Sequence, residues 1–218
     1  MRVLTTGVIV SVLMLSVLGA TSGEVTTAVE DVLRAVQTRY ADVNALQCSF
    51  EQENQYLGGE NFIQRGTLEM ERPAMMRWDY SEPTHRQFIS NGQKLWVVHP
   101  EEKRAFVMED VDAASQAQLF GFVIGLQDVR SHFTVELVPD GGAQHIRLKL
   151  TPLVAMAGVS IVWVDVLPGD HAIAAVTIED GMGNKTITRI SDMSTVDDIA
   201  DVRFNYEAPE GVEILPYN

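Results

Sequence analysis

The side chains that most often carry out catalysis or hold metals are scattered along this sequence. Each of the five histidines stands alone on a separate expected strand or turn, without a second ligand at metal-site spacing: His85, His99, His132, His145 and His171. Asp197, Asp198 and Asp201 could together bind a divalent ion, but we favour solvated loop charge. We therefore predict no metal site.

Motifs of common enzyme classes are also absent from the sequence. It contains no Gly-x-Ser-x-Gly nucleophile elbow, no phosphate-binding glycine loop and no dinucleotide fingerprint. A catalytic triad assembled from distant residues would leave no such motif. We predict that the protein is not an enzyme, with no catalytic residues and no cofactor.

The single cysteine, Cys48, limits the chemistry further. One cysteine cannot form an internal disulfide, and it makes a cysteine-based metal site implausible. Cys48 also lies too far from the N-terminus to be the acylated cysteine that follows a lipoprotein signal. We expect it to be a small buried side chain on a strand.

The dipeptide Arg72-Pro73 predicts the end of a strand. Proline cannot donate to the hydrogen-bond ladder of a sheet, and it restricts the residue before it. The guanidinium of Arg72 would then stand at a strand end, where it can donate to carbonyl oxygens of a neighbouring segment.

Aromatic residues recur along the segments that follow, several of them at every second position. They are Trp78, Tyr80, Phe88, Trp96 and Phe106. Side chains two apart on a strand share one face of the sheet, so we expect these rings to line one face. Residue counts alone favour an ordinary core over the lining of a cavity.

The elements that would position these residues are a helix followed by strands. Apolar residues at three- and four-residue spacing predict an amphipathic helix from Thr27 to about Val43, with a capping box of Thr27 and Glu30. Alternation then predicts eleven or twelve strands, with Asn91-Gly92 as the strongest hairpin signal. We place them at 46–51, 62–71, 75–80, 86–90, 94–99, 103–108, 132–138, 145–150, 160–166, 172–179, 185–191 and 202–206.

Strands in direct succession with hairpin turns predict an antiparallel sheet. A sheet of this size is expected to curl, with helices over its concave face. Between Asp110 and Asp128 the strand pattern stops, and an apolar segment containing Gly121 and Gly125 predicts one or two short helices with a flexible joint.

The N-terminus has the order of a secretory signal peptide. Arg2 precedes an apolar run, Val3 to Leu18, and small residues follow to Gly23. At roughly 16 residues the run is shorter than the ~20 that span a bilayer. We expect a signal peptide at 1–23 and one mature domain at 24–218, the alternative being an uncleaved anchor. The net charge of −14 disfavours nucleic acid and stable contact with anionic membranes.

Several short motifs follow one another along the chain after the expected signal peptide. They are Ser49-Phe50-Glu51-Gln52, the block from Gly66 to Tyr80 with its Arg-Pro and Arg-Trp-x-Tyr, Gly92-x-x-Leu95-Trp96, and the closing Phe204-x-x-x-x-Pro209-x-Gly211-Val212. In this order and spacing the sequence resembles the outer-membrane lipoprotein carrier family, LolA.

The resemblance implies an α+β fold, an incomplete antiparallel β-barrel of about eleven strands with an apolar cavity under lid helices. Arg72 would bond to the lid, 113–126, and hold the empty cavity shut. The cavity would take up acyl chains with the side chains of Met76, Trp78, Tyr80, Phe88, Trp96, Phe106, Leu119, Phe120, Phe122, Val123 and Leu126.

The same resemblance implies a monomeric periplasmic shuttle that carries acylated lipoproteins from the inner to the outer membrane. Its expected partners are an inner-membrane ABC-type lipoprotein release complex and an outer-membrane lipoprotein receptor. Three alternatives stay open: a carrier or sensor of another lipid, a secreted lipid hydrolase, and a structural envelope protein with a filled core.

Overall fold

The computed structural model describes residues 22–109, 129–138, 144–156 and 158–217, and side chains from residue 28 onward. In chain order the elements are α1 (Ser22–Arg39), β1 (Ala45–Gln55), β2 (Phe62–Glu71), β3 (Met75–Glu82), β4 (Arg86–Asn91), β5 (Leu95–His99), β6 (Arg104–Met108), α3 (Val129–His132), β7 (Phe133–Val138), β8 (Ile146–Pro152), β9 (Ile161–Val166), β10 (Ile173–Glu179), β11 (Lys185–Val196), the 3₁₀ helix η1 (Asp201–Phe204) and β12 (Glu213–Pro216).

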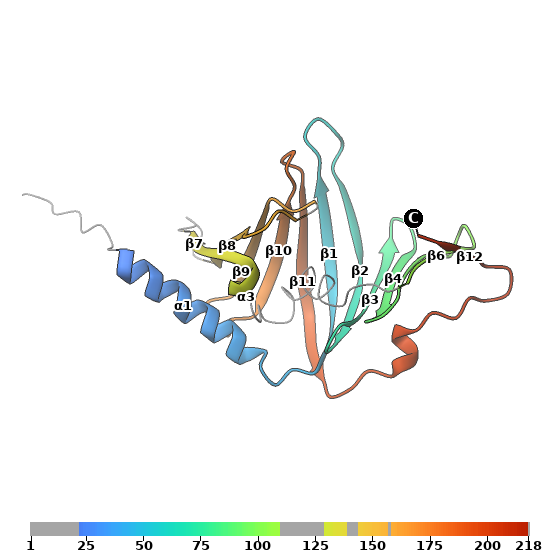
Figure 1. Ribbon diagram of the computed structural model, residues 1–218, viewed down its shortest axis with the longest axis horizontal. Coiled ribbons are helices and arrows are strands. Elements are labelled where there is room, and N and C mark those ends of the chain that lie inside the picture. Colours follow the sequence, from blue (N-terminus) through green and yellow to red (C-terminus); the bar gives the residue numbers. More distant parts are fainter. Residues whose placement is uncertain (1–21, 110–128, 139–143, 157, 218) are drawn as a thin grey trace, which may run out of the picture.

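These strands form one sheet in the order β12-β6-β5-β4-β3-β2-β1-β11-β10-β9-β8-β7. Two antiparallel meanders, β1 to β6 and β7 to β11, are joined where β1 pairs with β11. Since β12 and β7 stand at opposite ends of the order, the described sheet is open (Figure 1). The predicted α+β fold with an incomplete barrel is confirmed.

The turn between β4 and β5 forms as its sequence predicts. Gly92 has a φ of 86°, a conformation that glycine adopts without steric cost. The side-chain oxygen of Asn91 accepts hydrogen bonds from the backbone N–H groups of Gln93 (3.0 Å) and Lys94 (2.9 Å). Asn-Gly therefore fixes the register in which β4 and β5 pair.

The prediction of a strand at 202–206 is wrong. The chain forms η1 there, closed by a hydrogen bond from the N–H of Arg203 to the carbonyl of Ala200 (2.8 Å). Phe204 is fully buried against Ala45 and Ile199, so its burial comes from covering the sheet and not from joining it. The last strand is instead β12, which pairs with β6 in parallel, the exception in an otherwise antiparallel sheet.

Helix α1 starts five residues before the predicted position, at Ser22. Thr27 therefore lies inside the helix, and the predicted capping box is wrong. The buried stripe is as expected: Val29, Leu33, Val36 and Tyr40 enter the main core. No helix in the described ranges is long and apolar enough to cross a membrane.

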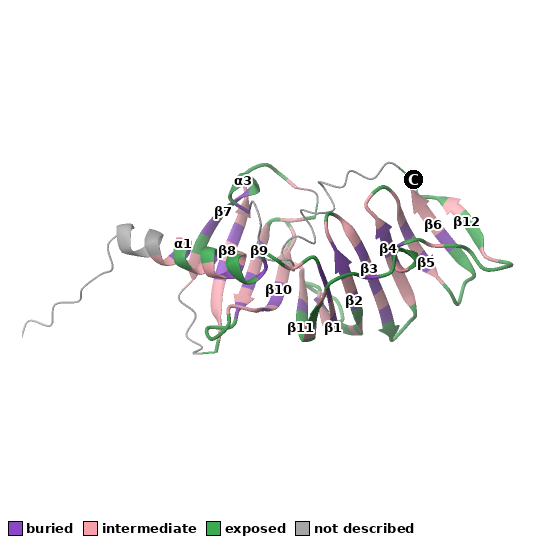
Figure 2. Ribbon diagram, turned by 90° about the horizontal axis from the view of Figure 1, so that it is seen from below, coloured by how far each residue is buried: buried purple, intermediate pink, exposed green. Residues whose placement is uncertain are grey.

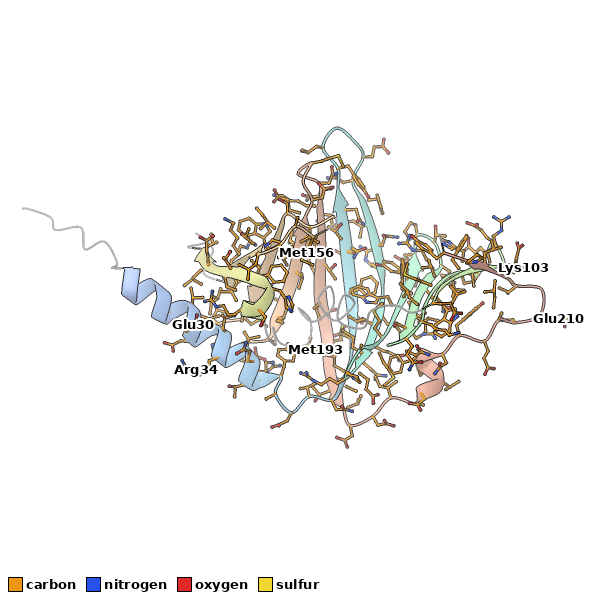
Figure 3. The ribbon with its side chains drawn as sticks, viewed as in Figure 1. Glu30, Arg34, Lys103, Met156, Met193 and Glu210 are labelled. Atoms are coloured by element: carbon orange, nitrogen blue, oxygen red, sulfur yellow. The ribbon has the colours of Figure 1, made fainter. Side chains whose placement is uncertain are left out.

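The outer side of α1 is polar. Arg34 pairs with Asp31 on the exposed surface (3.4 Å), and Glu30 forms an ion pair with Arg130 of α3. Figure 3 labels Glu30 and Arg34 on this helix. The Glu30–Arg130 pair links α1 to the short helix that leads into β7.

Burial alternates along the strands, which gives the sheet two different faces (Figure 2). One face carries the main core, to which strands from both meanders and α1 contribute; we call it the inner face. The other, outer face has two smaller clusters, one over β4 to β6 and one at the ends of β1, β3 and β11. There the C-terminal segment, through Phe204, Tyr206 and Val212, packs against the strands.

Candidate functional site

Arg72 stands directly after β2 and binds the end of α1. Its Nε donates to the carbonyl oxygen of Val43 (2.8 Å), and its Nη2 donates to that of Tyr40 (3.2 Å). Carbonyl groups at a helix end carry partial negative charge and favour a cation. The prediction that Arg72 caps carbonyls of a neighbouring segment is confirmed, whereas its bond to the lid concerns 113–126, outside the described residues.

Glu71, which the sequence analysis did not identify, completes this junction on the outer face. Its buried carboxylate accepts hydrogen bonds from the N–H of Ile199 (2.8 Å) and from Nδ2 of Asn44 (3.3 Å). The N–H of Arg72 donates to the carbonyl of Asn44 (3.0 Å). Glu71 and Arg72 therefore hold the end of α1, the end of β2 and the C-terminal segment together.

Four aromatic rings lie side by side on the inner face. The ring of Phe50 is 4.8 Å from Trp78 and 5.0 Å from Tyr80, and Tyr80 is 5.9 Å from Phe88, between ring centroids. Met76 precedes Trp78 and Tyr80 on β3 and is buried in the same core. The structure therefore brings four of the predicted cavity residues, Met76, Trp78, Tyr80 and Phe88, to one face, together with Phe50.

Gly66 allows this cluster to form. It pairs with Phe50 on one side and Tyr80 on the other, in the centre of the aromatic group. A Cβ atom at this position would stand 1.9 Å from the carbonyl oxygen of Asp79 and 2.9 Å from Cζ of Phe50. Only glycine fits between the two strands.

The placement of Trp96 on the same face is wrong. Trp96 pairs with Ile89, and both belong to the outer-face cluster with Tyr206 and Val212. Spacing of two residues shows which side chains share a face only within one strand. Trp96 lies on a different strand from Trp78 and Phe88, and the register between strands fixes which of these residues share a face.

Phe106 does lie on the inner face, because it pairs with Val97, which pairs with Phe88. Its ring sits apart from the cluster, 6.0 Å from His99 and 6.4 Å from Tyr217. The five remaining predicted cavity residues lie outside the described ranges: Leu119, Phe120, Phe122, Val123 and Leu126.

The inner face becomes polar at one level of the sheet. The hydroxyl of Tyr80 donates to Oε1 of Gln52 (3.1 Å), and Nε2 of Gln52 donates to Oγ1 of Thr188 on β11 (3.1 Å). The guanidinium of Arg86 lies over the ring of Tyr80 at 4.9 Å. Burial raises the pKa of Tyr80, and the nearby charge of Arg86 opposes that rise.

Met193 and Cys48 add sulfur-containing side chains to the inner face. The hydroxyl of Tyr40 contacts Sδ of Met193 (3.5 Å), which Figure 3 labels beside β11. Cys48 is buried, as predicted, and burial raises the pKa of its thiol to about 12. An ionised thiol is therefore absent at neutral pH, and Cys48 acts as an apolar side chain.

The outer face holds a groove of about 750 Å³ across β11, β1, β2 and β3, and its walls are more polar than the inner face. Charged and hydroxyl side chains line most of it, and Arg65 there pairs with Glu51 (2.8 Å) and Glu82 (3.2 Å). Within the described ranges no group of histidine, cysteine and acidic residues could hold a metal ion. An apolar ligand is therefore better matched by the inner face.

Comparison with known proteins agrees with this arrangement. The family described as "Outer membrane lipoprotein carrier protein LolA" matches residues 41–207. A protein of Alkalilimnicola ehrlichii named outer-membrane lipoprotein carrier protein is 27% identical over 179 residues, 81% of this chain and 79% of that protein. One of the same name from Halorhodospira halophila is 26% identical over 197 residues, 86% and 87% of the two chains.

Among solved structures, an uncharacterised conserved protein of Thermus thermophilus shares the fold, with a TM-score of 0.54 and 10% identity. The match covers 87% of this chain and 99% of that one.

Proposed function

Since the chain belongs to the LolA family of outer-membrane lipoprotein carriers, we propose that it binds the acyl chains of lipoproteins on the inner face of its sheet and carries them from the inner to the outer membrane. The observation that carries this proposal is the inner face itself. Both meanders and α1 contribute apolar side chains to one continuous cluster there.

The physical need for such a face is large. Burying one methylene group is worth about 0.8 kcal/mol, so a chain of about 15 methylenes exposed to water would cost on the order of 12 kcal/mol. A lipoprotein with several acyl chains cannot cross an aqueous compartment at that cost. An apolar cavity between the sheet and its covering helices removes most of it.

The empty carrier has the opposite problem, because an empty apolar cavity loses contacts between its walls. We propose that residues 113–126 act as a lid that closes over the unloaded cavity and opens when cargo replaces its contacts. Arg72 would hold the closed state. Its bonds to Tyr40 and Val43 place it where the end of α1 meets β2, a position suited to link helix movement with the sheet.

The remaining parts of the proposal follow from the family. LolA proteins are carriers rather than enzymes, and we propose that this chain likewise catalyses no reaction. It would work in the periplasm as a monomer, with a signal peptide at 1–23 and one carrier domain at 24–218. An inner-membrane ABC-type release complex would load it, and an outer-membrane lipoprotein receptor would unload it.

The test is uptake of a fluorescent apolar probe by the purified protein, with triacylated lipoprotein as competitor, for the wild type and Arg72→Leu. We expect saturable uptake that lipoprotein displaces, and slower cargo release from the variant if Arg72 drives closure. Absence of uptake by both proteins would mean a filled core and would exclude a carrier.

A further inference from the structure

Arg86, the first residue of β4, is unusual among the arginines of the described chain. Its Nε is buried and has no hydrogen-bond acceptor. Every other arginine in the described ranges has a carboxylate or a backbone carbonyl as partner: Arg34, Arg39, Arg65, Arg72, Arg77, Arg104, Arg130, Arg147, Arg189 and Arg203. A buried donor left without an acceptor is costly, and more so in a cation.

The position of Arg86 explains why its Nε–H lacks an acceptor. Arg86 pairs with Tyr80 across β3 and β4, which places both on the inner face. Its guanidinium lies between two rings, 4.9 Å from the centre of Tyr80 and 4.9 Å from that of Phe88. Such cation–π contacts favour the positive charge, but a ring face gives the Nε–H no oxygen acceptor. Arg86 also forms a side-chain hydrogen bond with Tyr80, which leaves Nε as the donor without a partner.

Arg86 belongs to a row of polar groups that crosses the inner face. From Arg86 the row passes to Tyr80, then to Gln52, which accepts from the Tyr80 hydroxyl, and then to Thr188, which accepts from Gln52. The neighbouring row is apolar, since Phe50 pairs with Ile190 where Gln52 pairs with Thr188. On the inner face, the apolar row of Phe50 and Ile190 is therefore directly followed by the polar row of Gln52 and Thr188.

A bound acyl chain likewise has an apolar part next to a polar part. Its tail is hydrocarbon, and its head is a carbonyl or carboxylate group that has acceptor oxygens and no donor of its own. With the tail against Phe50, Trp78 and Met76, the head would reach the polar row, where the Nε–H of Arg86 is a donor that lacks an acceptor. Hydrogen bonds from a guanidinium to such oxygens are among the strong ones.

We propose that Arg86 and Tyr80 form a subsite that binds the carbonyl or carboxylate oxygens at the head of an acyl chain and sets the direction in which the chain lies. The inference rests on the proposed carrier function. It assigns to Arg86 a role in specificity, because an oxygen-bearing head would be preferred to a plain hydrocarbon of the same length. Gln52 would orient the Tyr80 hydroxyl through their hydrogen bond.

The experiment compares three probes: pyrene-labelled hexadecanoic acid, its methyl ester, and pyrene-labelled hexadecane. Each is titrated into the wild type, Arg86→Met and Arg86→Lys. Methionine keeps the length and apolar stem of arginine but removes the donors. The matched control is Arg65→Met, which removes one positive charge from the outer face, where Arg65 pairs with Glu51 and Glu82.

We expect Arg86→Met to weaken binding of the oxygen-bearing probes about tenfold, or about 1.4 kcal/mol, and to leave hexadecane binding unchanged. Arg86→Lys should fall between, since its compact ammonium keeps the charge but not the fork of donors. Arg65→Met should leave all three affinities as in the wild type. Loss for both acid and ester would identify ester carbonyls of a lipidated cargo as the ligand. Loss for the acid alone would identify a free fatty acid carboxylate.

Two results would count against the subsite. Equal losses for all three probes would mean that Arg86 only packs in the cavity wall, and no loss for any would mean that the head does not reach it. The wild type gives a test that needs no variant, because it must bind the acid or the ester more tightly than hexadecane. If the wild type takes up none of the probes, the carrier function itself fails.

Discussion

Replacing Gly66 with alanine should be far more costly than a single methyl group suggests. The new Cβ would stand 1.9 Å from the carbonyl oxygen of Asp79 and 2.8 Å from its carbonyl carbon, and both are backbone atoms in the neighbouring strand. Backbone in a sheet cannot rotate away as a flexible side chain can. β2 and β3 must therefore move apart by more than about 1 Å, which breaks ladder bonds beside the Gly66–Tyr80 pair.

Overpacking of this kind typically costs about 1–3 kcal/mol and sometimes more, and the clash with backbone places Gly66→Ala at the upper end. For a chain of this size, 3 kcal/mol corresponds to a fall in Tm of about 6–12 °C. Thermal unfolding followed by circular dichroism measures it. The matched control is Gly181→Ala, because a Cβ at Gly181 meets nothing within 4 Å.

The control should change the stability by less than about 0.5 kcal/mol. A Tm for Gly66→Ala equal to that of Gly181→Ala would refute the reasoning, since it would show that β2 and β3 separate without loss. A second readout follows from the aromatic cluster. Because the same Cβ would stand 2.9 Å from Phe50, uptake of the apolar probe should weaken in the variant as well.

Three further predictions concern single residues. Glu71→Ala should lower the free energy of unfolding by about 1–3 kcal/mol in chemical denaturation, because it leaves the N–H of Ile199 without its acceptor; an unchanged stability would contradict that role. Tyr80→Phe should weaken binding of the pyrene-labelled acid by less than Arg86→Met does, since the charge of Arg86 remains; a larger loss would reverse the proposed order of importance. For Cys48, the folded thiol has a raised pKa of about 12 against about 9 when unfolded, so the unfolded state loses its proton first and stability should fall as pH rises above 9. The slope of the denaturation midpoint against pH should be smaller in Cys48→Ala, and the part that remains comes from groups such as Tyr80, whose pKa burial also raises; an unchanged slope would contradict the role of Cys48.

The sequence was informative where a signal is local. Asn91-Gly92 demands a turn whatever surrounds it, and Arg72-Pro73 ends a strand for reasons that lie in the two residues themselves. The antiparallel pairing followed from alternation and turn residues, whereas the resemblance to LolA implied that the barrel is incomplete. These features depend on the geometry of a few neighbouring residues, so a single sequence suffices to predict them.

Features that depend on how one strand or segment packs against another could not be predicted from the spacing of residues within a strand. Trp96 faces the outer side because of the register of β4 with β5, and Phe204 is buried without being in a strand. Nothing in the sequence distinguishes Glu71 and Arg86 from the other charged residues on strands. Only the fold shows that the carboxylate of Glu71 accepts a buried backbone N–H and that Nε of Arg86 is buried without an acceptor.

The central claim is that acyl chains bind on the inner face, and the three tryptophans can test it directly. Trp78 lies on the inner face. Trp96 lies in an outer-face cluster, and Trp163 of β9 points outward because its neighbours Val162 and Val164 are in the inner core. Each tryptophan can be isolated by replacing the other two with phenylalanine.

The measurement is quenching of tryptophan fluorescence by a fatty acid brominated along its chain, since bromine quenches only at contact. The account predicts strong, saturable quenching in the protein that keeps Trp78, and none in those that keep Trp96 or Trp163. Quenching of Trp96 or Trp163 with Trp78 unaffected would place the acyl chain on the outer face and would contradict the account.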